Sequence, residues 1–183
     1  MAQNASYVRD FRNIALAGFM GTGKSTVGQI VAEALRFEFI DTDAQIEKRS
    51  GKSIAQIFAS EGEAIFRRLE SELAQELGTR QRLVVSTGGG FLMNPENLAA
   101  LQEHALVVCL WASPETIWHR VRHQTHRPLL QSSDPLAKIG ELLQERTAVY
   151  KKADTLITTE LRSPREVAMH VLKQFNLARK LRK

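Results

Sequence analysis

The sequence predicts an α/β protein in which a five-stranded parallel sheet is covered by helices on both faces. Short apolar runs alternate with longer helical patterns along the chain, and the runs are continuously apolar. Such runs are typical of strands in parallel sheets that are buried on both sides. A chain of 183 residues, 43% of them hydrophobic, is long enough for one domain with its own core. We therefore expect a three-layer α/β/α architecture in a single domain, residues 1–183.

Five apolar runs mark the expected strands, at Asn13–Gly18, Phe37–Asp41, Leu83–Thr87, Ala105–Trp111 and Thr155–Thr158. Apolar residues spaced three and four apart predict helices between them. These are Ser25–Leu35, Ala44–Arg49, Ile54–Ser60, Ala64–Leu77, Pro95–Gln102, Pro114–Arg122, Leu136–Lys152 and Pro164–Phe175. The stretch His123–Pro135 has little periodicity and is expected to be a loop. Ligands of such sheets bind beyond the carboxyl ends of the strands, so the site is expected there.

Composition excludes several classes of protein. No apolar run reaches the roughly 18 residues of a membrane-spanning helix, and the start of the sequence lacks a secretory signal. A single cysteine, Cys109, excludes an internal disulfide framework. Lys and Arg exceed Asp and Glu by 25 to 20, but much of the excess lies in the tail 178–183, which we expect to be a frayed, solvated end. We expect a cytoplasmic monomer that binds neither nucleic acid nor membrane.

A phosphate-binding loop is the strongest local motif. Residues Gly18–Ser25 fit the pattern G-x-x-x-x-G-K-[ST], between an expected strand and an expected helix. Glycines let backbone N–H groups surround phosphate oxygens, Lys24 reaches the β- and γ-phosphates, and the Ser25 hydroxyl ligates Mg²⁺. A plain glycine turn is the alternative. The motif predicts binding of a nucleoside triphosphate with Mg²⁺ through Gly21, Thr22, Gly23, Lys24, Ser25 and Thr26.

Two carboxylates follow the second expected strand, at Asp41 and Asp43. Residues two apart in an extended chain face the same way, so both would project from one strand end beside the phosphate loop. One could hold the metal shell and the other could meet an acceptor hydroxyl. The alternative is that Asp43 caps the helix that follows.

The chain resembles the shikimate kinase family from about Asn13 to Phe175. Four ordered signatures carry the resemblance, and two downstream stretches add to it. They are GFMGTGKST from Gly18, Asp41–Asp43, Phe66–Glu70, Ser86–Gly90, Arg127–Leu130 and Glu145–Tyr150. The resemblance implies a P-loop fold of the nucleoside-monophosphate-kinase type. It also implies Mg²⁺-dependent transfer of a phosphoryl group from ATP to the 3-hydroxyl of shikimate, in the synthesis of chorismate and the aromatic amino acids.

The resemblance also implies roles for individual residues. Arg67 and Arg146 would bind the shikimate carboxylate, with Glu70 holding Arg67, and the glycines Gly88, Gly89 and Gly90 would lie under the ring. Asp43 would accept hydrogen bonds from the acceptor hydroxyls and is the candidate for taking the reacting proton. Asp41 and Ser86 would act through Mg²⁺-bound water. The segment 42–78 would bind the acceptor, and 120–135 would form a mobile lid that carries the catalytic Arg127. Arg120 and Pro164 would sandwich adenine.

Two other readings remain open. Another small-metabolite kinase of the same fold, such as a gluconate kinase, should lack the paired arginines together with the triple glycine, and both are present. A non-catalytic relative that acts as a binding or regulatory protein is expected to have lost Lys24, Asp43 or one of the arginines, and none is lost.

Overall fold

The computed structural model describes residues 9–123 and 133–180, and within them five strands form one parallel sheet in the order β2-β3-β1-β4-β5. The expected fold class is confirmed. The strands are β1 (Asn13–Ala17), β2 (Glu38–Asp41), β3 (Leu83–Ser86), β4 (Ala105–Trp111) and β5 (Thr155–Thr158). β1 lies at the centre, with Ala15 in register with Val85 on one side and with Val107 on the other.

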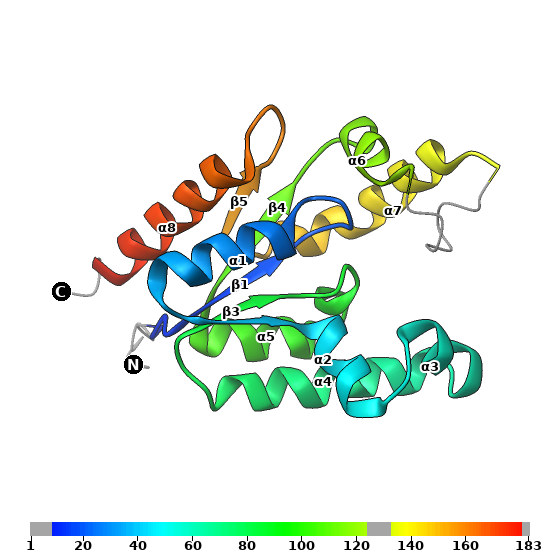
Figure 1. Ribbon diagram of the computed structural model, residues 1–183, viewed down its shortest axis with the longest axis horizontal. Helices are drawn as coiled ribbons and strands as arrows, with labels where there is room; N and C mark the ends of the chain where they lie inside the picture. The colour runs from blue at the N-terminus through cyan, green and yellow to red at the C-terminus, as the bar shows by residue number, and fades with distance from the viewer. Residues whose placement is uncertain (1–8, 124–132, 181–183) are drawn as a thin grey trace, which may run out of the picture.

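Helices connect the strands and cover both faces of the sheet (Figure 1). They are α1 (Lys24–Leu35), α2 (Thr42–Ser50), α3 (Ile54–Ser60), α4 (Glu63–Gly78), α5 (Pro95–His104), α6 (Pro114–Val121), α7 (Pro135–Tyr150) and α8 (Pro164–Lys180). Side chains alternate across β1, because successive residues of a strand point to opposite faces. Ile14 and Leu16 pack with α1 and α8, whereas Ala15 and Ala17 pack with α4 and α5.

Three local predictions differ from the structure. A short 3₁₀ turn, η1 (Phe91–Met93), follows the triple glycine, and α2 begins at Thr42 rather than Ala44. Helix α8 continues to Lys180, so a frayed tail is wrong for residues 178–180. Arg and Lys are good helix formers and are favoured at a helix C-terminus, and the Arg179 guanidinium lies 5.5 Å from the centre of the Phe175 ring.

Among the helices of the described residues, none is both long enough and apolar enough to cross a membrane. The loops at the carboxyl ends of β1, β2 and β3 lie together at one end of the sheet, where the predicted site residues are found. The amino ends of these strands lie at the opposite end, where α8 also ends (Figure 1).

Candidate active site

The phosphate loop lies between the end of β1 at Ala17 and the start of α1 at Lys24. Gly21 and Gly23 have positive φ angles of 73° and 91°, a conformation that favours glycine. The loop is closed on itself, because the Thr22 hydroxyl and Lys24 Nζ donate hydrogen bonds to the Phe19 carbonyl oxygen over 2.8 and 2.9 Å. Thr22 is buried.

The Ser25 hydroxyl lies among oxygen donors from two neighbouring strand ends. It donates to Asp41 Oδ2 over 2.9 Å and lies 3.3 Å from Ser86 Oγ. Asp41 also caps α2, because its other carboxylate oxygen accepts hydrogen bonds from the backbone of Asp43 and Ala44. The sequence-based capping alternative was therefore placed on the wrong aspartate.

Asp43 lies in the first turn of α2, not in an extended strand, yet it reaches the triple glycine. A Cβ atom on Gly88 would lie 2.4 Å from Asp43 Oδ1, so only glycine leaves room there. The Gly88 N–H donates to the buried Thr42 hydroxyl over 2.9 Å, which fixes the turn against the start of α2. The Asp43 carboxylate and the glycine turn are thus in direct contact.

Arg67 lies on α4 between two carboxylates. Its Nη1 donates to Glu70 Oε2 over 2.7 Å and its Nη2 to Glu63 Oε1 over 2.8 Å. The Glu70 side chain is only 1% exposed, so this is not an ordinary surface ion pair. Burial raises the pKa of Glu70, and the hydrogen bond from Arg67 opposes that rise. A Cβ atom on Gly90 would lie 2.9 Å from Arg67 Nη1, so the guanidinium packs against the turn.

Arg146 approaches the same turn from α7. Its Nη1 donates to the Gly89 carbonyl oxygen over 3.1 Å, and its guanidinium lies 5.2 Å from the centre of the buried Phe19 ring. The Tyr150 hydroxyl donates to the same carbonyl oxygen over 3.0 Å. Burial raises the pKa of Tyr150 to about 12, so its hydroxyl remains a donor at neutral pH.

Two residues are expected near adenine, Arg120 and Pro164. Arg120 on α6 donates to the Gly21 carbonyl oxygen of the phosphate loop over 3.2 Å, and to Thr159 Oγ1 and the Thr159 carbonyl oxygen over 2.9 and 2.8 Å. Pro164 is the exposed first residue of α8. Arg127 lies outside the described residues, as does most of the expected lid.

A cavity of about 520 Å³ unites the phosphate loop with the two strand ends. Of the predicted residues, those lining it are Gly21, Gly23, Lys24, Ser25, Thr26, Asp41, Asp43, Ser86 and Gly89. Arg67, Gly88, Gly90 and Arg146 are joined to this group through their contacts with Asp43 and the glycine turn. Thr22, Arg120 and Pro164 do not line it.

Sequence reasoning missed Thr42 and Tyr150, which both fix the glycine turn. Tyr150 follows Arg146 by four residues on a predicted helix, and this spacing places two side chains on the same face. That signal was available. No signal in the sequence pairs the Thr42 hydroxyl with the Gly88 N–H, because the pairing depends on the parallel register of β2 and β3.

Comparisons with known proteins identify the family to which the chain belongs. The model of the family "Shikimate kinase" matches residues 20–176. A shikimate kinase of Thermodesulfovibrio yellowstonii is 44% identical over 90% of this chain and 95% of its own. A shikimate kinase of Pelotomaculum thermopropionicum is 46% identical over 90% of this chain and 98% of its own.

Solved structures extend the comparison. The shikimate kinase of Acinetobacter baumannii in complex with shikimate is 38% identical, covers 96% of this chain and 98% of its own, and superposes with a TM-score of 0.86. A gluconokinase of Sinorhizobium meliloti, at 19% identity and a TM-score of 0.59 over 94% of this chain and 97% of its own, shares the fold alone. With the family model matching most of its length, the chain belongs to the shikimate kinase family.

Proposed function

We propose that the cavity at the carboxyl ends of β1, β2 and β3 transfers the γ-phosphoryl group of ATP to the 3-hydroxyl of shikimate. One observation carries the proposal. Two guanidinium groups from different helices, those of Arg67 and Arg146, flank the same glycine turn, which follows the strand beside the phosphate loop. The site thus combines a phosphate cradle with a pair of carboxylate-binding groups.

Arg67 and Arg146 bind the carboxylate of the acceptor. A guanidinium offers two parallel donors to a carboxylate, and such charge-assisted hydrogen bonds are stronger than neutral ones. The carboxylates of Glu63 and Glu70 hold Arg67 in place, and the Gly89 carbonyl oxygen holds Arg146. The bare backbone of Gly88–Gly90 leaves room for a ring, and Asp43 beside it accepts hydrogen bonds from ring hydroxyls.

The phosphates of ATP bind at the N-terminus of α1. Backbone N–H groups there point toward the ligand and the helix dipole favours an anion, while Lys24 supplies a full positive charge. Transfer of a phosphoryl group depends mainly on positioning and on neutralising charge. Asp43 accepts the proton that the acceptor hydroxyl loses.

A magnesium ion fits the oxygen donors around Ser25. The Ser25 hydroxyl lies 2.9 Å from the Asp41 carboxylate and 3.3 Å from the Ser86 hydroxyl. Mg²⁺ prefers hard oxygen ligands and keeps several waters, so Ser25 would bind it directly and Asp41 and Ser86 would bind its waters. When bound, the ion neutralises charge on the phosphates.

Further parts of the proposal concern the rest of the chain. Residues 120–135 act as a lid that excludes water, with Arg127 reaching the phosphates, and the segment 42–78 forms the acceptor side. Arg120 and Pro164 contact adenine. We also propose a monomeric, cytoplasmic enzyme with no nucleic-acid partner.

The direct test is an assay of ADP release with ATP, Mg²⁺ and one acceptor at a time, comparing shikimate, quinate and gluconate. Shikimate should be strongly preferred, and NMR of the product should place the phosphate on the 3-hydroxyl. The variant Lys24→Met should fold normally and lose turnover. Equal rates with gluconate, or a phosphate on another hydroxyl, would overturn the proposal.

A further inference from the structure

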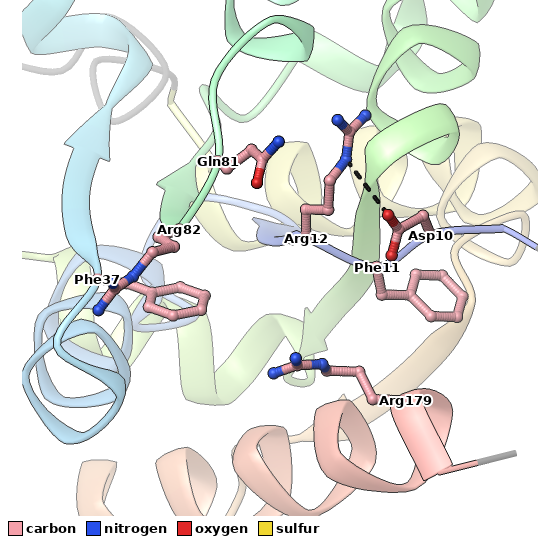
Figure 2. Close-up of a pocket in the computed structure, with 7 residues that line it drawn as sticks. All are labelled: Asp10, Phe11, Arg12, Phe37, Gln81, Arg82 and Arg179. Atoms are coloured by element: carbon pink, nitrogen blue, oxygen red, sulfur yellow. Dashed lines mark ion pairs between the residues drawn. The ribbon is translucent and has the colours of Figure 1, made fainter. Parts of the chain in front are cut away.

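Figure 2 shows a second cavity, of about 270 Å³. Most of its lining residues precede β1, β2 and β3, so it lies at the end of the sheet opposite the active site (Figure 1). Its walls come from the residues before β1, the residues before β2 and β3, and the last turn of α8. They include Asp10, Phe11, Arg12, Phe37, Arg82 and Arg179. We call this the amino-end pocket. Because the phosphate loop follows the carboxyl end of β1, the length of this strand separates the two cavities.

The amino-end pocket has an excess of positive charge. Its walls carry three arginines against one carboxylate, that of Asp10, which leaves two positive charges. Asp10 Oδ2 lies 3.9 Å from Arg12 Nε, too far for a hydrogen bond, and this buried Nε has no hydrogen-bond partner among the described residues. Within residues 9–123 and 133–180, neither Arg82 nor Arg179 forms an ion pair.

Stabilisation of helix C-termini explains only part of this arrangement. Arg82 Nη2 donates to the Arg36 carbonyl oxygen just beyond α1, over a long 3.3 Å. A helix C-terminus carries only about half a negative charge, so it does not balance these guanidinium groups. Arg82 also has a φ of 62°, a left-handed conformation that a residue with a side chain rarely adopts. Strained residues of this kind are enriched at functional sites.

Two aromatic rings give the pocket an apolar side. Phe11 and Phe37 line it (Figure 2). The Phe37 ring is fixed by edge-to-face packing on Phe175, with 6.0 Å between ring centres and an angle of 86° between ring planes. A ligand that suits this pocket therefore has a flat apolar body beside its charged group.

We propose that the amino-end pocket binds a small organic phosphate monoester with a single apolar ring. A phosphate monoester carries about −1.5 to −2 at pH 7, which matches the two excess positive charges, whereas one carboxylate carries half of that. Guanidinium groups bind phosphate oxygens through paired donors. The cavity volume accommodates one ring with its phosphate. This site is independent of the phosphoryl transfer described above.

Phenyl phosphate is the probe, with inorganic phosphate and phenol as partial probes. Backbone amide NMR signals of residues 10–12 and 81–82 report on the amino-end pocket and not on the phosphate loop. Phenyl phosphate should shift them saturably, with a dissociation constant below about 1 mM. Inorganic phosphate should bind about tenfold or more weakly, and phenol should not bind at these concentrations.

Paired variants separate a site from general attraction by charge. Arg82→Gln with Arg179→Gln should weaken binding of phenyl phosphate by about tenfold or more. Arg68→Gln with Lys173→Gln removes the same charge from exposed positions outside the pocket and should leave binding unchanged. If the first pair does not fold, Arg179→Lys, which keeps the charge but loses the paired donors, should still weaken binding.

Three results would overturn the proposal. They are the absence of saturable shifts at residues 10–12 and 81–82, equal effects of the two paired variants, and equal binding of inorganic phosphate and phenyl phosphate. The last would mean that the aromatic side of the pocket contributes nothing.

Discussion

Arg146 and Tyr150, one turn apart on α7, donate hydrogen bonds to a single acceptor, the carbonyl oxygen of Gly89, over 3.1 and 3.0 Å. The arginine that we expect to bind the acceptor carboxylate is thereby tied to the glycines that we expect to lie under the acceptor ring. Tyr150 touches neither substrate in this account. It acts by positioning the turn and the guanidinium together.

Removal of the Tyr150 hydroxyl should therefore affect the acceptor and not the nucleotide. Tyr150→Phe keeps the ring but loses one hydrogen bond of about 0.5–1.5 kcal/mol, which corresponds to a rise of about 2- to 10-fold in KM for shikimate. KM for ATP should not change. Thr147→Val on the same helix loses a hydrogen bond to the Leu143 carbonyl oxygen and is the control. A purely structural role would lower the melting temperature and leave both KM values alone.

Gly88 should tolerate no side chain. In Gly88→Ala the new Cβ would lie 2.4 Å from Asp43 Oδ1 and 3.3 Å from Glu70 Oε1, so the carboxylate must move. A displacement of a catalytic group by about 1 Å can cost about 100-fold, so kcat/KM for shikimate should fall by that order. The control is Gly140→Ala on α7, where a Cβ meets nothing within 4 Å. It should retain activity and gain about 0.5–1 kcal/mol of stability.

The dependence of stability on pH should contain a contribution from His104, which is 2% exposed. Burial, with the nearby Arg12 charge, lowers the pKa of His104 from 6.5 to about 4. Between these values the unfolded chain binds the additional proton, so the free energy of unfolding falls as the pH falls from 6.5 to 4. The loss amounts to at most about 3 kcal/mol, and this histidine adds no further loss below pH 4.

Urea unfolding at a series of pH values isolates that contribution. His104→Gln should flatten the slope between pH 6.5 and 4, because glutamine binds no proton in this range. The variant should still fold, because the glutamine amide oxygen can accept the hydrogen bond that Asn13 Nδ2 makes with His104 Nδ1. His170→Gln, at an exposed position on α8, should leave the slope unchanged. Equal slopes in wild type and His104→Gln would show that His104 is protonated at the same pH in the folded and unfolded chains.

Sequence reasoning predicted the sheet well, because continuous apolar runs such as Ala105–Trp111 are typical of strands that are buried on both faces of a parallel sheet. It located Asp41 and Asp43 beside the phosphate loop but assumed an extended chain through both. The structure ends β2 at Asp41 and starts α2 at Thr42. Strand-to-helix boundaries depend on capping, and sequence reasoning considered only Asp43 as a cap, whereas Asp41 caps the helix.

Other features of the site depend on contacts between distant segments. The spacing of three residues on a helix predicted that Glu70 could reach Arg67, but not that Glu70 would be buried beside Gly88. The amino-end pocket could not be predicted from the sequence either, because residues before three different strands meet the end of α8 there. Composition suggested only a solvated basic tail there, because no local pattern shows which arginines share a cavity.

We propose above that Arg67 selects the acceptor by binding the acceptor's carboxylate. The most direct measurement compares kcat/KM of wild type and Arg67→Ala for shikimate and for shikimate methyl ester. Loss of a charge-assisted hydrogen bond to a carboxylate costs roughly 1.5–3 kcal/mol, or more in a closed site. Shikimate should therefore lose about 10- to 1,000-fold, and the uncharged ester much less. Arg68→Ala, at the next and exposed position of α4, should change neither value. An equal loss for both acceptors would contradict the account, because Arg67 would then act on the fold or on the phosphates.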